Sequence, residues 1–273
     1  MNLVLVFAHE VDGDAARLEA KDSRAKHIVR HLRKKVGDSL RVGIVDGPIG
    51  EATVSETSGD VVALQLDRTT LRPPPPRPHI EVLLGMPYPG VLKRMWAVWA
   101  SMGVSRVCVF SAELSDPEYG MTSALTSEVY EPLVLEGLAQ SLDTRRPVVD
   151  SWHDRKLEDV LAMLPGSADD ARLLFDLGDA PSVRDTIDSI PARTILAVGP
   201  ERGWTDNEVR CFSAAGFVAV SMGKRVLRTD VASIAAIALV SDVLRHMQHR
   251  GPSSQHNPSF FDFICPSLDM DTS

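Results

Sequence analysis

The chain has 273 residues, of which 44% are hydrophobic and 24% are charged, a composition typical of a globular protein with about two domains. Its apolar runs are far shorter than the roughly 20 residues that cross a bilayer, and the three cysteines, Cys108, Cys211 and Cys265, fit neither a disulfide framework nor a zinc ribbon. We therefore expect a cytoplasmic protein with no membrane partner and no signal peptide, whose net charge of −8 argues on average against a nucleic-acid partner.

The first part of the chain, residues 1–70, is expected to form a small β-barrel. Short alternating segments lie at 3–7, 39–45, 51–54 and 61–66, and glycine-containing turns separate them. One helix is predicted here, over 27–35, because Ile28, Val29 and Leu32 have apolar helical spacing.

This region also carries a local surplus of positive charge. Nine basic residues stand against three acidic ones between Arg17 and Arg41. Such a run fits either a solvated helix face or a nucleic-acid-binding surface. The candidate RNA contacts within it are Arg24, Lys26, Arg30, Arg33 and Lys34. His27 and His31 have the spacing of a zinc pair but no third ligand is evident, so we expect no metal site.

A proline-rich segment over 71–79 predicts a stiff linker, because proline fixes φ and removes amide donors. Strands and helices then alternate over 80–250. Strands are predicted at 80–84, 104–110, 173–177, 194–198 and 217–221, and helices at 91–102, 125–142, 205–215 and 232–246. This order favours a mostly parallel sheet covered on both faces, with a ligand site where the strands end. The polar tail, 251–273, is expected either to be disordered or to dock its phenylalanines on a neighbour.

Two glycine-bearing loops in this second part carry candidate chemistry. In the first, Gly199 and Gly203 allow close approach of a ligand, Glu201 adds a carboxylate, and Thr205 with Glu208 predicts a capping box. Neither a Walker loop nor a dinucleotide fingerprint is present, which disfavours ATP and NAD.

The second loop, Ser221 to Asp230, is basic and leads directly into an apolar helix. Arg228 is placed either to bind a carboxylate or phosphate or to pair with Asp230. Thr229 or Asp230 is placed to cap the helix.

Together these motifs resemble the RsmE family of 16S ribosomal RNA uridine N3-methyltransferases, which belong to the SPOUT superfamily. The resemblance rests on four islands in the expected order: the segment from His27 to Asp38, Glu136-x-x-x-Gln140-Ser141 with Pro147, Gly199-Pro200-Glu201-x-Gly203, and Gly223-x-Arg225-Val226-Leu227-Arg228-Thr229.

The resemblance implies an α/β fold: an N-terminal PUA-like barrel over 1–70, the linker over 71–79, and a SPOUT domain with a C-terminal trefoil knot over 80–250. It implies S-adenosylmethionine as the cofactor, small-subunit ribosomal RNA as the partner, and a homodimer that packs the helices of the knot together. The cofactor contacts that it implies are Leu177, Gly178, Leu196, Val198, Gly199, Pro200, Glu201, Gly203, Met222, Gly223, Val226 and Leu227.

Methylation of uridine N3 requires alignment of the reacting atoms and removal of the N3 proton. We expect Arg228 to stabilise charge that develops on a uracil oxygen or to orient a phosphate. Glu201 or Asp230 is the candidate proton acceptor, although either could instead only fix the loops. Arg145 is a further candidate RNA contact.

Several positions depart from the family pattern: Arg202 replaces a glycine, Val98 a lysine, Asp143 an arginine, and Asp230 a glutamate. They leave two alternatives open. One is another SPOUT activity, such as methylation of the tRNA ribose 2′-oxygen, and the other is an RNA-binding protein with impaired catalysis.

Overall fold

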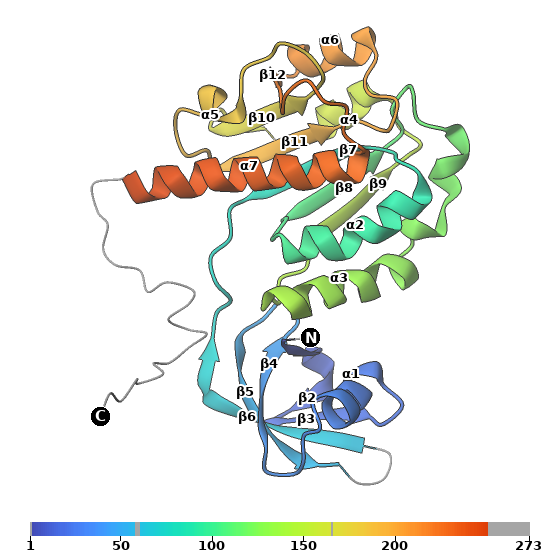
Figure 1. Ribbon diagram of the computed structural model, residues 1–273. Coiled ribbons are helices and arrows are strands. Elements are labelled where there is room, and N and C mark those ends of the chain that lie inside the picture. The colour runs from blue at the N-terminus through green and yellow to red at the C-terminus, as the bar shows by residue number, and fades with distance from the viewer. Residues whose placement is uncertain (1, 58–60, 165, 251–273) are drawn as a thin grey trace.

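The computed structural model describes residues 2–57, 61–164 and 166–250, and the tail predicted over 251–273 lies outside them. Two sheets form the framework, one in each part of the chain (Figure 1). The predicted fold class is confirmed, since a curled half-barrel precedes a parallel α/β unit.

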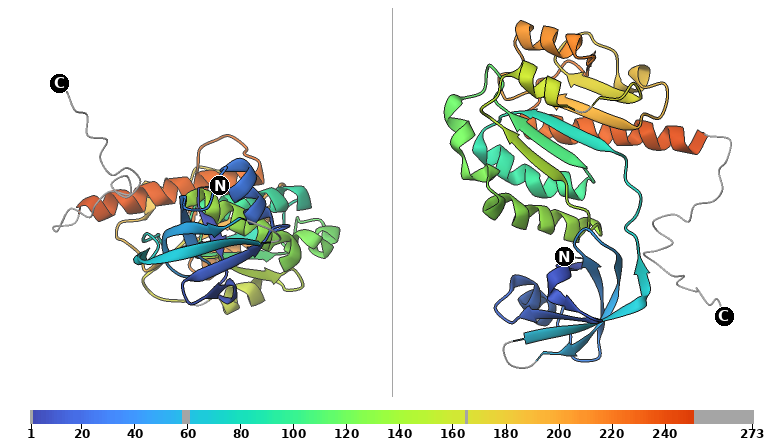
Figure 2. Two further views of the ribbon diagram at one scale, coloured as in Figure 1. Left: turned by 90° about the horizontal axis from the view of Figure 1, so that it is seen from below. Right: turned by 180° about the vertical axis from the view of Figure 1, so that it is seen from behind.

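The first sheet has the order β1-β4-β5-β6-β3-β2. β1 and β4 are parallel, and the other neighbouring strands are antiparallel. Its strands are β1 (Val4–Val6), β2 (Val11–Asp12), β3 (Ala15–Glu19), β4 (Ser39–Ile44), β5 (Ile49–Glu56) and β6 (Val61–Arg72), with a short turn η1 (Ala8–Glu10) after β1. β2 and β3 were not expected from the sequence, and β6 extends two residues into the predicted linker. The remaining linker, 73–79, runs along one side of the structure from β6 to the second sheet (Figure 2).

The helical stretch of the barrel begins earlier than predicted. It consists of α1 (Ser23–Lys26) and a π-helical turn η2 (His27–His31). Asp22 starts the helix because its carboxylate accepts the Arg24 amide, 2.7 Å away. Ile28 is buried, whereas Val29 and Leu32 are exposed, so the predicted apolar face is wrong for two of its three members.

The second sheet is entirely parallel, with the order β12-β10-β11-β7-β8-β9. Its strands are β7 (Ile80–Gly85), β8 (Arg106–Phe110), β9 (Val148–Trp152), β10 (Asp170–Phe175), β11 (Arg193–Val198) and β12 (Val218–Val220). The helices and turns are α2 (Pro89–Ser101), η3 (Pro117–Met121), η4 (Ser123–Leu125), α3 (Ser127–Ser141), α4 (Leu157–Met163), α5 (Val183–Thr186), α6 (Asp206–Ala214) and α7 (Thr229–Arg250). Sheet and helices together confirm the predicted parallel arrangement.

Helices cover both faces of this sheet. α2, α3, α5 and α7 contribute to the larger core on one face, and α4 and α6 to the core on the other. After β12, residues 221–228 pass beside the 199–204 loop, and α7 then begins on the face opposite α6 (Figure 1). The expected trefoil knot involves this crossing of the 199–204 and 221–228 segments.

The barrel and the α/β unit share part of one core. Leu3, Leu5 and Val45 pack into the larger core with residues of α2 and α3. The amides of Asn2 and Leu3 both donate to the Ala139 carbonyl at the end of α3, at 3.1 Å. The barrel is therefore docked on α3 as well as joined through the linker.

α2 and α3 approach each other closely at one glycine. A Cβ on Gly137 of α3 would lie 2.1 Å from the Ala97 carbonyl oxygen of α2. We predict that Gly137→Ala lowers the free energy of unfolding by about 1–3 kcal/mol, as overpacking does, although alanine in a helix ordinarily stabilises by about 1 kcal/mol. Denaturant unfolding measures the effect. Glu136→Ala, on the exposed adjacent residue, is the control, and a Gly137→Ala protein of equal or greater stability would contradict the packing.

Candidate functional site

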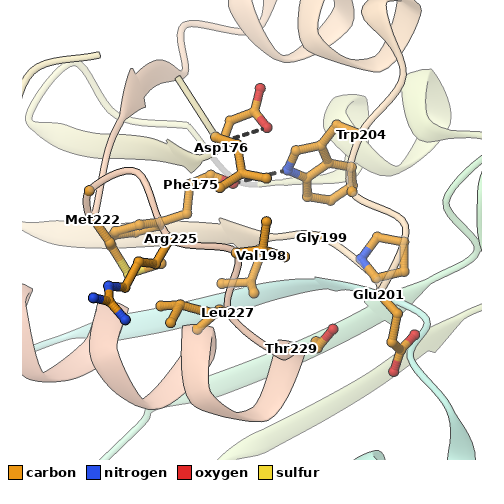
Figure 3. A pocket seen from close by; sticks show the side chains of 16 residues that line it. Phe175, Asp176, Val198, Gly199, Glu201, Trp204, Met222, Arg225, Leu227 and Thr229 are labelled. Carbon is orange, nitrogen blue, oxygen red and sulfur yellow. Dashed lines mark hydrogen bonds between the residues drawn. The ribbon is translucent and has the colours of Figure 1, made fainter. Parts of the chain in front are cut away.

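A pocket opens at the carboxyl ends of β10 and β11, where parallel α/β sheets generally bind ligands. The space that it encloses is about 630 Å³ with the open mouth included. Four segments line it: the end of β10, the loop after β11, the loop after β12 and the start of α7 (Figure 3). The lining residues are Phe175, Asp176, Leu177, Val198, Gly199, Pro200, Glu201, Gly203, Trp204, Met222, Gly223, Arg225, Val226, Leu227, Thr229 and Ala232.

The loop after β11 is held rigidly. A Cβ on Gly85 would come 2.6 Å from Pro200 Cδ, so only glycine allows this approach of β7 to the loop. Trp204 Nε1 donates to the Phe175 carbonyl at 3.2 Å, and the Gly203 amide donates to the Pro200 carbonyl at 2.9 Å. The wall of the pocket is therefore preformed.

α6 anchors the end of the same loop. The predicted capping box is confirmed: the Thr205 hydroxyl accepts the Glu208 amide at 3.2 Å, and Glu208 Oε2 accepts the Thr205 amide at 2.9 Å. Glu208 is buried, and its Oε1 also accepts the Glu113 amide at 2.8 Å. One carboxylate thus fixes the loops that follow β8 and β11.

Thr229, at the start of α7, presents a polar group with no protein partner. Its side chain lines the pocket and is 4% exposed, and its Oγ1 makes no hydrogen bond to any described residue. A buried hydroxyl without a partner is costly, so Oγ1 is a natural contact for a ligand. Of the two residues predicted to cap α7, Thr229 makes no capping hydrogen bond. Asp230 Oδ1 instead accepts the amide of Val231 at 3.0 Å.

Most of the predicted cofactor residues line this one pocket. Leu196 and Gly178 do not: Leu196 is buried in the core two residues before β11 ends, and Gly178 lies beyond the β10 segment that reaches the pocket. The sequence reasoning missed Phe175, Asp176, Trp204, Arg225, Thr229 and Ala232 as pocket residues. Trp204, Arg225 and Thr229 lie within or directly beside the two loop motifs, which could have found them. Phe175 and Asp176 lie at the end of β10 and Ala232 lies within α7, outside those motifs.

Of the three candidate catalytic residues, Glu201 lines the pocket, whereas Arg228 and Asp230 do not. Glu201 Oε1 accepts the Tyr88 amide of α2 at 3.0 Å. The Arg228 guanidinium donates to Asp230 Oδ2 at 2.8 Å, the pairing that the sequence left open, and Arg94 of α2 donates to the same oxygen at 3.2 Å.

The surroundings of Asp230 make it a poor base. Burial alone would raise the pKa of this carboxyl, but the hydrogen bonds from Arg94 and the Val231 amide, with the charge of Arg228, hold it below its ordinary value. A carboxylate with a lowered pKa has little tendency to take up a proton. Glu201 is the better-placed acceptor of the two.

The predicted RNA contacts separate into two groups. Lys26, Arg30 and Arg33 are exposed on α1, η2 and the turn that follows, and Lys34 is half-buried. Arg24 is held within the barrel by Glu10, Asp22 and the Leu5 carbonyl. Arg145 pairs with Asp143 at 2.9 Å and donates to the Pro75 carbonyl of the linker. Arg24 and Arg145 are therefore engaged in contacts within the protein.

The described part of the chain offers two further observations. It contains no helix long and apolar enough to span a membrane. It also contains no group of three or more histidine, cysteine, aspartate or glutamate side chains that could hold a metal, and the rings of His27 and His31 stack with centroids 5.3 Å apart.

Known proteins resemble this chain along most of its length. Residues 73–241 match a family described as RNA methyltransferase domain. The ribosomal RNA small subunit methyltransferase E of Treponema pallidum is 30% identical, over 94% of this chain and 100% of the relative. The ribosomal RNA small subunit methyltransferase E 1 of Borreliella burgdorferi is 25% identical, over 90% and 100%.

Solved structures share the fold. A probable rRNA-methyltransferase from Porphyromonas gingivalis superposes with a TM-score of 0.72 at 22% identity, covering 89% of this chain and 98% of that one. A ribosomal RNA small subunit methyltransferase E from Neisseria gonorrhoeae, bound to S-adenosyl methionine, gives a TM-score of 0.68 at 20% identity, covering 86% and 95%.

Arg24 provides a test of the barrel's internal charge cluster. Burial alone would raise the pKa of Glu10, but hydrogen bonds from Arg24 and the Phe7 amide lower it, and hydrogen bonds from Arg24 also lower the pKa of Asp22. Carboxyl groups with lowered pKa values stabilise the fold above their unfolded pKa of about 4 and lose that contribution as the pH falls through the folded value.

We predict that Arg24→Ala lowers the unfolding free energy by about 2 kcal/mol at neutral pH. The difference from the wild type should narrow below about pH 4, where the carboxyls are protonated in both proteins. Denaturant unfolding at several pH values measures it, with Lys21→Ala, on an exposed lysine of the same region, as the control. A difference that stays constant with pH would contradict the role of the cluster.

Proposed function

The chain belongs to the RNA methyltransferase domain family and, within it, to the ribosomal RNA small subunit methyltransferase E proteins, and on that premise we propose that it methylates N3 of a uridine in small-subunit ribosomal RNA with S-adenosylmethionine. The observation that carries the proposal is the pocket between the 199–204 and 221–228 loops, which coincides with the two glycine-bearing motifs.

The residues of the pocket suit this cofactor. Phe175, Val198 and Leu227 offer an apolar surface for the adenine ring. Asp176 adds a carboxylate for the ribose hydroxyls, and the unpartnered Thr229 hydroxyl can donate to a carboxylate or accept from an ammonium group. When bound, S-adenosylmethionine supplies an electrophilic methyl group on a cationic sulfur.

The protein's part in the reaction is to orient the uridine and to remove its N3 proton. We propose that Glu201, which lines the pocket, accepts the N3 proton. Asp230 is the weaker candidate because it already accepts hydrogen bonds from two guanidinium groups and an amide. Arg228, whose side chain is 69% exposed and pairs with Asp230, is assigned the stabilisation of negative charge on a uracil oxygen. The target base must leave its stack to reach the pocket.

The barrel is assigned the contact with the RNA backbone. Lys26, Arg30 and Arg33 stand exposed on one short helical segment, where they can neutralise phosphates. In this division of the chain, residues 1–70 bind RNA, 71–79 connect, and 80–250 carry the methyl transfer. Such an enzyme meets its substrate where ribosomal subunits are assembled, so we place it in the cytoplasm.

We also propose that the protein works as a homodimer through α7. Val231, Ile234 and Leu239 are exposed apolar residues on this helix, while Ala236, Ile237 and Val240 face the core. Exposed apolar side chains at helical spacing suit a second copy of the same surface.

The product of the reaction tests the proposed function. Small ribosomal subunits from a strain that lacks this gene are incubated with the protein and S-adenosylmethionine, and digested nucleosides are analysed by mass spectrometry. We predict one 3-methyluridine per subunit. Methylation of a ribose 2′-oxygen would contradict the N3 assignment, and the absence of any transfer would contradict the enzymatic one.

Thr229 tests how the pocket holds its cofactor. We predict that Thr229→Val, which keeps the shape and removes the hydroxyl, weakens S-adenosylmethionine binding by roughly 5- to 100-fold, the cost of one hydrogen bond to a charged group. Titration calorimetry measures the affinity. Thr229→Ser should retain most of it, and unchanged affinity in the valine variant would remove the hydroxyl from the binding site.

A further inference from the structure

A second surface adjoins the pocket at the amino end of α2. It consists of Tyr88, Gly90 and Arg94, and none of these three lines the pocket itself. Glu201 connects the two places because it lines the pocket while its carboxylate accepts the Tyr88 amide. The packing of Gly85 against Pro200 fixes the same junction. The position of Tyr88 relative to the pocket is therefore set by two independent contacts.

The ring of Tyr88 is held in place and left open. It is 55% exposed, and Tyr119 meets it edge to face, with centroids 5.7 Å apart and an interplanar angle of 75°. A Cβ on Gly90 would lie 2.8 Å from Tyr88 Cε1, so the ring lies across the glycine. Tyr88 occupies the cap position of α2 but gives the helix no side-chain hydrogen bond. A fixed, exposed aromatic ring of this kind is a surface on which a base can stack.

Positive charge lies on one side of this ring. Arg94 and Arg228 both donate to Oδ2 of Asp230, so two guanidinium groups share one carboxylate and leave a net positive charge. Their side chains are 55% and 69% exposed. The Arg94 Nη1 atom would lie 3.8 Å from a Cβ on Gly90, the same Cβ that would meet the Tyr88 ring. The aromatic and cationic groups are thus neighbours.

Acidic groups lie near Tyr119, the residue that meets this ring edge to face. Burial, together with the charges of Asp116 and Glu201, raises the pKa of Tyr119. A phosphate would be repelled there and attracted to Arg94 and Arg228. The charges therefore favour an anion beside Arg94 and Arg228, next to α7, over one beside Tyr119.

We propose that Tyr88 and Arg94 hold the extruded nucleotide: the Tyr88 ring stacks on its pyrimidine base, and Arg94 binds its phosphate. This inference rests on the proposed function and names the residues through which the same site receives its substrate. Arginine suits the phosphate because its donors are arranged as a fork, and stacking suits a base taken out of its helix.

The test compares steady-state kinetics of variants with small ribosomal subunits from the deletion strain as substrate. Tyr88→Ala and Arg94→Ala should each lower kcat/KM for the subunits by about 10- to 100-fold, mainly through KM. Tyr88→Trp, which keeps an aromatic face, should retain most of the activity. Because Glu201 binds the backbone amide of Tyr88, the side-chain changes leave that hydrogen bond in place.

Three controls separate this role from a structural one. Lys93→Ala, on the adjacent exposed residue, should leave the kinetics unchanged. Calorimetry should show the same S-adenosylmethionine affinity in every variant. Gly90→Ala should displace the ring without destabilising α2, and so should raise KM while the unfolding free energy does not fall.

The outcomes distinguish this inference from the function on which it rests. A wild-type protein that transfers no methyl group to RNA would overturn both. Wild-type transfer together with unchanged KM in Tyr88→Ala and Arg94→Ala would overturn only the nucleotide site, as would loss of cofactor affinity in those variants.

Discussion

The close approach of the 199–204 loop to the strand ends is the constraint on which the site depends. Pro200 fits against Gly85 of β7 with no room for a side chain, and Trp204 bonds to the carbonyl of Phe175 at the end of β10. These contacts form one wall of the pocket, and residues 222–229 form the facing wall. A pocket bounded by rigid turns can orient a ligand without the entropic cost of ordering loops when the ligand binds.

The same rigidity extends to the barrel. Residues 143–146 join three parts of the molecule: Arg146 pairs with Asp46 of the barrel at 2.7 Å, the Thr144 hydroxyl donates to the Gly47 carbonyl at 2.5 Å, and Arg145 donates to the linker. Asp143, one of the departures from the family pattern, is buried and accepts from Arg145. The departure thus lies at the junction between the barrel and the α/β unit, where it binds the arginine that contacts the linker.

Sequence reasoning succeeded where the signal is local. The capping box at Thr205 and Glu208 and the parallel strands of the second sheet follow from spacing and hydrophobic runs. Most of the pocket residues follow from the family resemblance that the short motifs carry. It failed where distant segments meet. Arg24 lies in the basic run and Arg145 lies near the central motif, and both were candidate RNA contacts, yet Glu10 and Pro75 engage them in the fold. Arg94 and Asp230 are 136 residues apart, and no pattern in the sequence places them together or brings Tyr88 to Glu201.

The central claim is that these two loops enclose a methyl donor, and a crystal structure of the protein soaked with S-adenosylhomocysteine tests it most directly. The account predicts density for the ligand between Gly199 and Leu227, within hydrogen-bond distance of Thr229 Oγ1. A pocket that stays empty under saturating ligand, or a ligand bound elsewhere on the molecule, would contradict it.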